Sequence, residues 1–284
     1  MQVTLPFSVD LKGKVAVVTG AGGVLCSMFS RAVAQCGAKV ALLDRNEEAA
    51  AQVAREICAE GFEAKAYRCD VLDRAALEQV RDSVRQDLGS CDILINGAGG
   101  NNPRATTADE FLELENVQKD MTTFFDLDPA GVEFVFNLNF LGTLLPTQVF
   151  AQDMLGRQGC CVLNISSMNA YTPLTKIPAY SGAKAAVSNF TQWLAVYFAK
   201  AGIRVNAIAP GFFVTQQNRD LLFDQQGNPT PRTEKILNST PMGRFGEAQE
   251  LIGAVLFLLS QQAASFVTGV VIPIDGGFNA YSGV

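Results

Sequence analysis

Tyr180 and Lys184 stand four residues apart in the stretch YSGAK, a spacing that places both side chains on one face of a helix. Ser167 lies thirteen residues upstream, at the end of an apolar run typical of a strand. Taken alone the Tyr–Lys spacing also arises by chance, but with the serine the three side chains could converge at one sheet edge. The chain has no histidine, which removes Ser-His-Asp triads, Cys-His dyads and nearly all catalytic zinc sites. Proton chemistry must therefore use Tyr, Lys, Cys or carboxylates.

The stretch VTGAGGVLCSMF, residues 18–29, begins like a dinucleotide-binding loop and then departs from the pattern. Gly20 can make the tight turn, and Gly22 and Gly23 let the backbone approach a phosphate. Val24 is unexpected, because a β-branched residue does not easily take a positive φ. Backbone amides at the helix N-terminus could still hold an anion. A glycine-rich turn without a ligand remains the alternative.

Asp44 ends the second predicted strand, 24 residues after Gly20. A carboxylate there accepts hydrogen bonds from the adenosine ribose hydroxyls and repels a 2′-phosphate, so the sequence predicts NAD (NADH) rather than NADP. Arg45 could weaken this preference. The alternative is that Asp44 caps the following helix, and the two roles are compatible.

Short apolar runs alternate with amphipathic stretches along the whole chain, a pattern typical of a parallel sheet covered on both faces. We expect a doubly wound α/β (Rossmann) fold of about seven strands in a single domain, residues 1–284. The polar stretch 102–131 looks like an insertion near the carboxyl ends of the strands. The predicted strands are 14–20, 39–44, 64–70, 91–99, 160–167, 203–210 and 270–275, with clear helices at 46–61 and 73–89.

Composition excludes several classes of protein. The net charge of −6 without basic clusters argues against nucleic acid, and no apolar stretch reaches the roughly 18 residues of a membrane span. The N-terminus lacks a secretory signal, so we expect a cytoplasmic protein. The seven cysteines are scattered without metal-type spacing, which indicates free thiols and no metal.

The chain resembles the short-chain dehydrogenases/reductases over essentially its whole length. The motifs that carry the resemblance appear in that family's order. They are the Thr19-Gly20 loop, CDVLD with Asp70, NGAG at 96–99, Asn139 in LNFLGT, Ser167, YSGAK, APGFFVT at 209–215 and IDGG at 274–277.

This resemblance implies catalytic roles for four residues. Tyr180 would be the general acid/base, and Lys184 would lower its pKa and hold the nicotinamide ribose. Ser167 would hydrogen-bond the substrate oxygen. Asn139 would hold a water that links Lys184 to solvent, or else would simply bond helix backbone.

The resemblance also implies a set of cofactor contacts. Asp70 could instead cap the next helix, and Thr215 could be a local cap. The implied NAD-binding residues are Gly20, Gly22, Gly23, Val24, Leu25, Asp44, Asp70, Val71, Asn96, Ala98, Gly99, Tyr180, Lys184, Pro210, Gly211, Phe213 and Thr215.

Departures from the family pattern include Val24, Cys26 and the glycine of NGAG. With several other stretches they resemble one branch, the D-mannonate oxidoreductases (fructuronate reductases), which implies a sugar-acid substrate. Its carboxylate and hydroxyls call for cations and amides. The candidates are Asn101, Asn169, Lys176 and Arg219, with Asn102, Arg104 and Asn218 nearby.

Residues 212–240 could form a substrate lid, and the resemblance implies a homo-oligomer, a tetramer, packed through the tail and the helix near 247–261. Two alternatives stay open for the substrate: another keto sugar acid, as in a gluconate 5-dehydrogenase, or a secondary alcohol. A non-enzymatic NAD sensor or a structural scaffold fits less well, since neither needs four converging catalytic groups.

Overall fold

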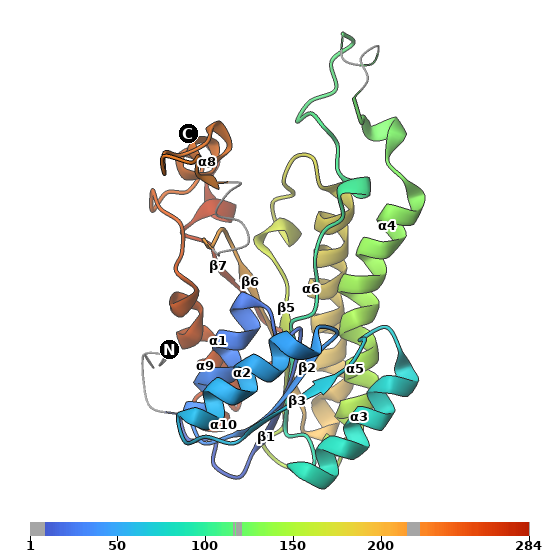
Figure 1. The fold of residues 1–284 in the computed structure, drawn as a ribbon, viewed down its shortest axis with the longest axis vertical. Coiled ribbons are helices and arrows are strands. Elements are labelled where there is room, and N and C mark those ends of the chain that lie inside the picture. Colours follow the sequence, from blue (N-terminus) through green and yellow to red (C-terminus); the bar gives the residue numbers. More distant parts are fainter. Residues whose placement is uncertain (1–8, 116, 118–120, 215–221, 284) are drawn as a thin grey trace.

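Seven parallel strands form one sheet in the order β3-β2-β1-β4-β5-β6-β7 (Figure 1). The computed structural model describes residues 9–115, 117, 121–214 and 222–283. All seven predicted strands are present, and the fold class is confirmed. The strands are β1 (Val15–Thr19), β2 (Lys39–Asp44), β3 (Ala64–Arg68), β4 (Ile93–Asn96), β5 (Cys161–Ile165), β6 (Arg204–Pro210) and β7 (Val271–Ile274).

The strand order reverses between β1 and β4, which are neighbours although β2 and β3 separate them in sequence. Thr19 pairs with Asn96 at the carboxyl ends of these two strands. In open parallel sheets, ligands bind outside the carboxyl ends of the strands at such a reversal. The fold therefore places the glycine loop, which follows β1, at the expected binding edge.

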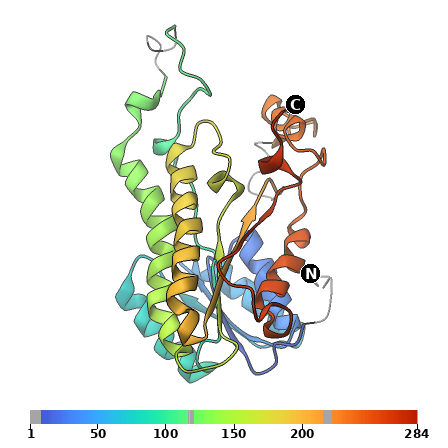
Figure 2. The same ribbon diagram turned by 180° about the vertical axis from the view of Figure 1, so that it is seen from behind.

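Helices cover both faces of the sheet and bury two apolar cores. Phe29 of α1, Ile57 of α2 and Leu256 of α9 pack on one face. Leu77 of α3 and Phe150 of α5 pack on the other, where α6 lies along α4 and α5 (Figure 2). The helices are α1 (Val24–Gln35), α2 (Glu47–Ala59), α3 (Arg74–Asp87), α4 (Pro129–Phe136), α5 (Gly142–Phe150), α6 (Pro178–Phe198), α8 (Pro231–Asn238), α9 (Ile252–Leu259) and α10 (Gln261–Ala264).

The segment Pro129–Met154 corrects one sequence-based prediction. It runs through α4, a π-helical turn at Asn137–Leu141 and α5, and by length and composition it is apolar enough to cross a membrane. Half of its most apolar window is buried inside the protein, as in core helices of soluble proteins. Its buried polar residues bond the preceding turns, as when Thr143 Oγ1 donates to Asn139 O at 2.8 Å. The segment thus serves as a core helix of this fold, and the absence of a membrane partner stays a prediction.

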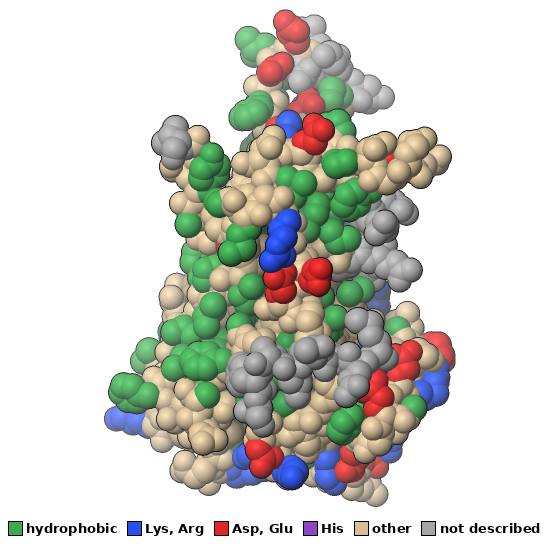
Figure 3. All heavy atoms as spheres, turned by 90° about the vertical axis from the view of Figure 1, so that its left-hand side faces the viewer, with side chains coloured by type: hydrophobic (Ala, Val, Ile, Leu, Met, Phe, Trp, Pro, Cys, Tyr) green, Lys and Arg blue, Asp and Glu red, His purple; other side chains and the backbone are tan. Residues whose placement is uncertain are grey.

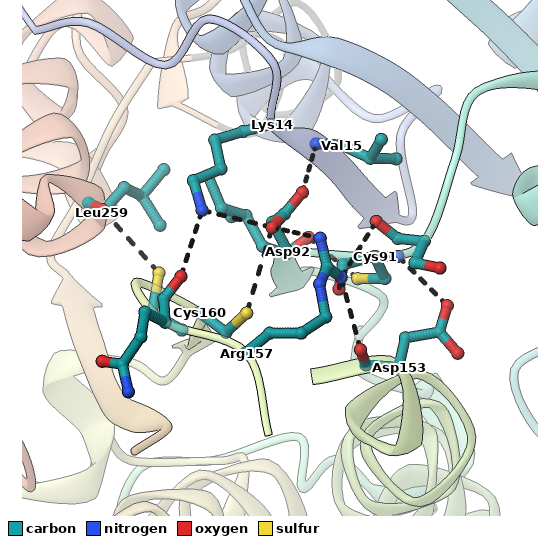
Figure 4. Close-up of polar contacts among 12 residues, drawn as sticks. Lys14, Val15, Cys91, Asp92, Asp153, Arg157, Cys160 and Leu259 are labelled. Atoms are coloured by element: carbon teal, nitrogen blue, oxygen red, sulfur yellow. Dashed lines mark hydrogen bonds and ion pairs between the residues drawn. The ribbon is translucent and has the colours of Figure 1, made fainter. Parts of the chain in front are cut away.

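A buried ionic cluster ties the strands together at the opposite edge of the sheet (Figure 4). Asp92, 2 % exposed, accepts hydrogen bonds from the backbone N–H of Val15 at 2.9 Å, from Lys14 Nζ at 3.2 Å and from Arg157 Nη2 at 2.6 Å. Asp153 accepts one from the backbone N–H of Cys91 at 3.0 Å and pairs with Arg85. Each carboxylate meets a backbone donor and a cation, so this cluster is structural.

The stretch predicted as an insertion, residues 102–131, is called the arm below. Its described part projects beyond the body of the protein above α4 (Figure 1). Arg104 forms an ion pair with Asp128, and the backbone N–H of Asp128 donates to Arg104 O at 3.1 Å, which closes the base of the arm. The backbone N–H of Thr107 donates to Lys176 O at 2.9 Å. The arm is therefore tied to the segment that precedes α6.

Candidate active site

The glycine loop makes its turn at Gly20, the one residue among 20–24 with a positive φ, +65°. Gly23 is the N-cap of α1, with φ −73° and ψ 155°, and Val24 is the first residue of that helix. Val24 therefore has helical backbone angles and does not need the positive φ that a β-branched residue adopts with difficulty. The N-terminus of α1 points its free amides at the loop, as binding of a pyrophosphate requires.

Asp44 braces this loop from the end of β2. Its Oδ2 accepts a hydrogen bond from the backbone N–H of Gly22 at 2.9 Å, and its Oδ1 accepts one from Asn46 at 2.8 Å. The cap of α2 is Asn46, whose side chain accepts from Ala49 N. Asp73 likewise caps α3, so the capping alternatives for Asp44 and Asp70 are wrong.

A cavity of about 490 Å³ lies at the reversal of the strand order. Nine of the predicted cofactor residues line it, and a carboxylate, a glycine cradle and apolar walls are what a dinucleotide requires. The residues therefore fit the cofactor. The predicted lining residues are Gly20, Gly23, Val24, Leu25, Asp44, Asp70, Val71, Ala98 and Gly99. The lining also includes residues that are not among the predicted cofactor contacts: Cys26, Arg45, Cys69, Leu72, Gly97, Phe134 and Leu138.

Other predicted cofactor residues lie outside this lining. Asn96 is buried and its Nδ2 donates to Thr147 Oγ1 and Asn164 Oδ1, both at 2.9 Å. Pro210 ends β6, Gly211 donates its N–H to Ile274 O, and Phe213 packs against Gly246. Their contacts with a cofactor stay predictions. Thr215, Asn218 and Arg219 lie outside the described residues.

Tyr180 and Lys184 lie on the first two turns of α6, with the Lys184 ammonium 5.7 Å from the centre of the Tyr180 ring. Pro178 begins this helix, where a missing N–H has no cost. Lys184 is 5 % exposed and its Nζ donates to Ile165 O, at the end of β5, at 2.8 Å. Ser167 follows β5 and shares a hydrogen bond with Tyr180. The structure thus brings the three residues together, as their spacing predicts.

Burial controls the protonation of this pair. It raises the pKa of Tyr180, and the hydrogen bond with Ser167 acts in the opposite direction. It also lowers the pKa of Lys184 to about 8, and the nearby Cys26 acts in the opposite direction. Burial and Ser167 are thus the influences on the Tyr180 pKa in the protein without cofactor, and the expected lowering by Lys184 stays a prediction. The lysine reaches the backbone of β5 rather than the phenol oxygen.

Asn139 occupies the π-helical turn between α4 and α5 and is fully buried. Its Nδ2 donates to Val135 O at 2.7 Å and to Gly100 O at 2.8 Å, and its Oδ1 accepts from the Gly100 N–H at 3.2 Å. A Cβ at Gly99 would lie 2.7 Å from Asn139 Oδ1 and 3.2 Å from Lys184 Nζ. Asn139 therefore holds the loop after β4 next to Lys184, and it also makes the helix-backbone bond of the alternative reading.

A second cavity, of about 480 Å³, is lined by the segment between Ser167 and α6 and is called the cationic cleft below. One wall is residues 172–176, which join Ser167 to the start of α6; Phe212 beyond β6 and helix α8 form the others. Lys176, with φ +72°, is the only non-glycine residue of the described chain with a positive φ. Such strain persists where the surroundings enforce it, often at a functional site.

Two basic residues of this cleft were missed by sequence reasoning. Arg232 and Lys235 lie three residues apart on α8, so both face the cleft from one side of the helix. The Thr230 cap and Pro231 at the first helical position are signals that could have identified this helix. Glu110 reaches the same cleft from the arm.

The other substrate candidates differ in whether their side chains already have hydrogen-bond or ion-pair partners. Asn169 is 4 % exposed and its backbone N–H donates to Ser167 Oγ at 3.3 Å, while its buried Oδ1 has no hydrogen-bond partner in the described chain. Asn101 bonds Thr106, Asn102 caps the turn that follows, and Arg104 pairs with Asp128 at the base of the arm. These three are occupied within the arm.

Comparisons with known proteins agree with this geometry. The short-chain dehydrogenase family model matches residues 14–226. A crystal structure of a candidate D-mannonate oxidoreductase from Haemophilus influenzae, with bound NAD, is 62% identical, with a TM-score of 0.94 over 97% of this chain and 98% of that one. An uncharacterized oxidoreductase of Bacillus subtilis is 49% identical over 99% of this chain and 100% of its own. A gluconate 5-dehydrogenase from Burkholderia cenocepacia, in complex with NADP and tartrate, is 30% identical, with a TM-score of 0.81 over 96% and 97%.

Proposed function

The chain belongs to the short-chain dehydrogenase family, and we propose that it transfers hydride between NAD(H) and a sugar acid, interconverting D-fructuronate and D-mannonate. It is an oxidoreductase acting on a CH–OH group, because it matches the short-chain dehydrogenase family and its similar proteins include oxidoreductases. The observation that carries the substrate proposal is the cationic cleft, where Lys176, Arg232 and Lys235 line a cavity of about 480 Å³. A carboxylate-bearing substrate is what such a cleft favours.

The cofactor proposal is supported by the first cavity. Asp44 lines it together with the glycine loop, and a carboxylate at this position disfavours the 2′-phosphate of NADP. The homologous crystal structure from H. influenzae carries NAD. Bound in this cavity, the dinucleotide would supply or accept the hydride. Lys184, whose Nζ donates to Ile165 O at the end of β5 at 2.8 Å, would hold the ribose of the dinucleotide.

The proton chemistry falls to Tyr180. A raised pKa keeps the phenol protonated at neutral pH, which is the form that donates a proton to the carbonyl oxygen of a ketone being reduced. Ser167 would hold that oxygen while negative charge develops. Asn139 would position Lys184 through the loop at Gly99 and Gly100. Asn169 Oδ1 would accept a hydrogen bond from a substrate hydroxyl.

A substrate panel tests this function. Purified enzyme is given NADH and D-fructuronate, 5-ketogluconate or an acetoacetate ester, with NADPH as the cofactor control, and the loss of reduced-cofactor absorbance is followed. We expect D-fructuronate with NADH to give the highest kcat/KM. A higher value with 5-ketogluconate would move the assignment to the gluconate 5-dehydrogenase type, to which the relative from B. cenocepacia belongs. Binding of NADH without reduction of any ketone would favour the NAD sensor.

A homo-oligomer is the assembly that the surface supports. In the predicted contact region near 247–261, α9 turns Ile252, Leu256 and Leu259 into the core, and its role in an oligomer stays a prediction. Exposed aromatic and apolar side chains gather on α6, where Trp193 is 58% and Val196 80% exposed. Hydrophobic side chains also spread over the side that carries α8 and the C-terminal segment, with charges mainly at its lower end (Figure 3). We therefore propose a tetramer that packs through α6 and through the side that carries α8 and the C-terminal segment. We also propose a cytoplasmic location and a single domain with a lid at 212–240.

A further inference from the structure

One carboxylate stands among the cations of the cationic cleft. Glu110, from the arm, accepts hydrogen bonds from Lys235 Nζ on both oxygens, at 3.0 and 2.9 Å. The hydrogen bond from Lys235 lowers the pKa of Glu110, and the charges of Lys235, Lys176 and Arg232 lower it further. All three cations therefore act on this one side chain, and it stays ionised at neutral pH.

Of the three cations, only Lys235 has an ion-pair partner within the described chain. Lys235 is paired with Glu110, whereas the side chains of Lys176 and Arg232 have no hydrogen bond or ion pair within the described chain. Like charges gathered at one cavity repel, and a nearby carboxylate relieves the repulsion. In the protein without substrate, Glu110 thus relieves the repulsion among these cations, as the carboxylate of a bound acid would.

The pair is also easy to exchange. The Lys235 side chain is 67% exposed and that of Glu110 31%, so water and salt screen their attraction, and such a pair contributes little to stability. A carboxylate that replaces Glu110 meets the same cation and can also reach two unpaired ones. The exchange therefore favours an incoming acid and does not favour a neutral sugar.

We propose that Glu110 is a built-in competitor for the substrate: it occupies the cations of the cationic cleft when the cleft is empty, and the carboxylate of the sugar acid takes its place. This inference rests on the proposed function, since it takes the substrate to be an acid bound in this cleft. It assigns acid recognition to Lys176, Arg232 and Lys235 together. It also makes Glu110 the residue that sets how tightly acids bind.

The test is Glu110→Gln, which keeps the size of the side chain and removes its charge. We expect the KM for D-fructuronate to fall about threefold, the range of a partly exposed ion pair. The inhibition constant of tartrate, a hydroxy acid, should fall in parallel. The KM for D-fructose, the same sugar with a neutral hydroxymethyl group in place of the carboxylate, should not change. Glu113→Gln, also on the arm and exposed, is the matched control and should leave all three values unchanged.

Each result decides the question. A higher KM for D-fructuronate in Glu110→Gln would mean that Glu110 holds the substrate or orders Lys235 for it, and would overturn the competitor role. Equal values in the variant and the wild type would also overturn it. Glu110→Ala repeats the test if the glutamine variant melts at a lower temperature. If the wild type itself does not reduce D-fructuronate, the proposed function fails, while tartrate affinity measured by calorimetry on the NAD complex still tests Glu110.

Discussion

Cys26 Sγ occupies the space that a side chain at position 97 would need, because a Cβ built on Gly97 would overlap the sulfur. Cys26 lies in the first turn of α1 and Gly97 follows β4, and both residues line the cofactor cavity. Each departs from the pattern of the family, in which glycine is usual at the first position and asparagine at the second. The two departures compensate for each other: the added sulfur fills the volume of the missing side chain.

Restoring only one of the two residues should therefore harm the protein. Gly97→Asn should lower the free energy of unfolding by about 1–3 kcal/mol, since it overpacks a filled site. Cys26→Gly in the same chain should recover most of that loss, because it removes the sulfur. A double-mutant cycle from urea unfolding measures the coupling. Additive effects of the two substitutions would show that the contact does not decide the choice of residues.

Asp44 should set the choice of cofactor. Asp44→Ala removes the carboxylate that disfavours a 2′-phosphate, and it also frees the Gly22 N–H from its 2.9 Å bond. We expect the ratio of kcat/KM for NADH to that for NADPH to fall at least about tenfold, since a hydrogen bond to a charged group contributes about 1.5–3 kcal/mol. Arg45→Ala added to Asp44→Ala should remove the increase in kcat/KM for NADPH, because Arg45 would be the cation next to the 2′-phosphate position. Wild-type enzyme that works faster with NADPH would contradict the assignment.

Lys184 should destabilise the protein that it makes active. Burial lowers its pKa from 10.5 to about 8, so the folded state holds fewer protons than the unfolded state between these values. The stability contributed by this residue therefore rises with pH across that window, and below about pH 8 the charged lysine opposes folding. Lys184→Met should be inactive yet melt at or above the wild-type temperature at pH 7, with the difference shrinking from pH 8 to 10.5. Lys200→Met, at an exposed lysine, should show no such trend.

The ionic cluster of Figure 4 should matter for stability and not for catalysis. Asp92→Asn leaves Lys14 and Arg157 without their buried counter-charge. We expect a loss of about 3–5 kcal/mol in the free energy of unfolding, as for other broken buried pairs. Asp82→Asn breaks only exposed pairs with Arg81 and Arg85 and should lose less than about 1 kcal/mol. Equal losses in the two variants would show that burial of Asp92 is not what gives the cluster its importance.

Periodicity and turn residues were enough to predict the sheet. Apolar runs predict all seven strands, but the run at 91–99 exceeds β4 at both ends, because the strand begins at Ile93 and ends at Asn96. The catalytic residues could also be predicted, since Ser167, Tyr180 and Lys184 lie within one strand–helix unit whose geometry is fixed locally.

Contacts between distant segments could not be predicted in this way. Glu110 and Lys235 are 125 residues apart, and neither stretch has a periodicity that indicates their pairing. The predicted difficulty at Val24 was wrong for a related reason: whether a residue needs a positive φ depends on where the helix begins, and α1 begins at Val24 itself. Polar residues interrupt the apolar run within Pro129–Met154, so the sequence does not reveal that this continuous helix is long and apolar enough to cross a membrane; in the fold it serves as a core helix.

The most direct test of the account is NADH-dependent reduction of D-fructuronate by the wild type and by Tyr180→Phe, measured side by side. The account predicts rapid turnover by the wild type and a loss of at least about a hundredfold in kcat for the variant, because the phenol supplies the proton. Binding of NADH should be retained, since the glycine loop and Asp44 are untouched. Turnover that survives in Tyr180→Phe, or a wild type that leaves D-fructuronate unchanged, would contradict it.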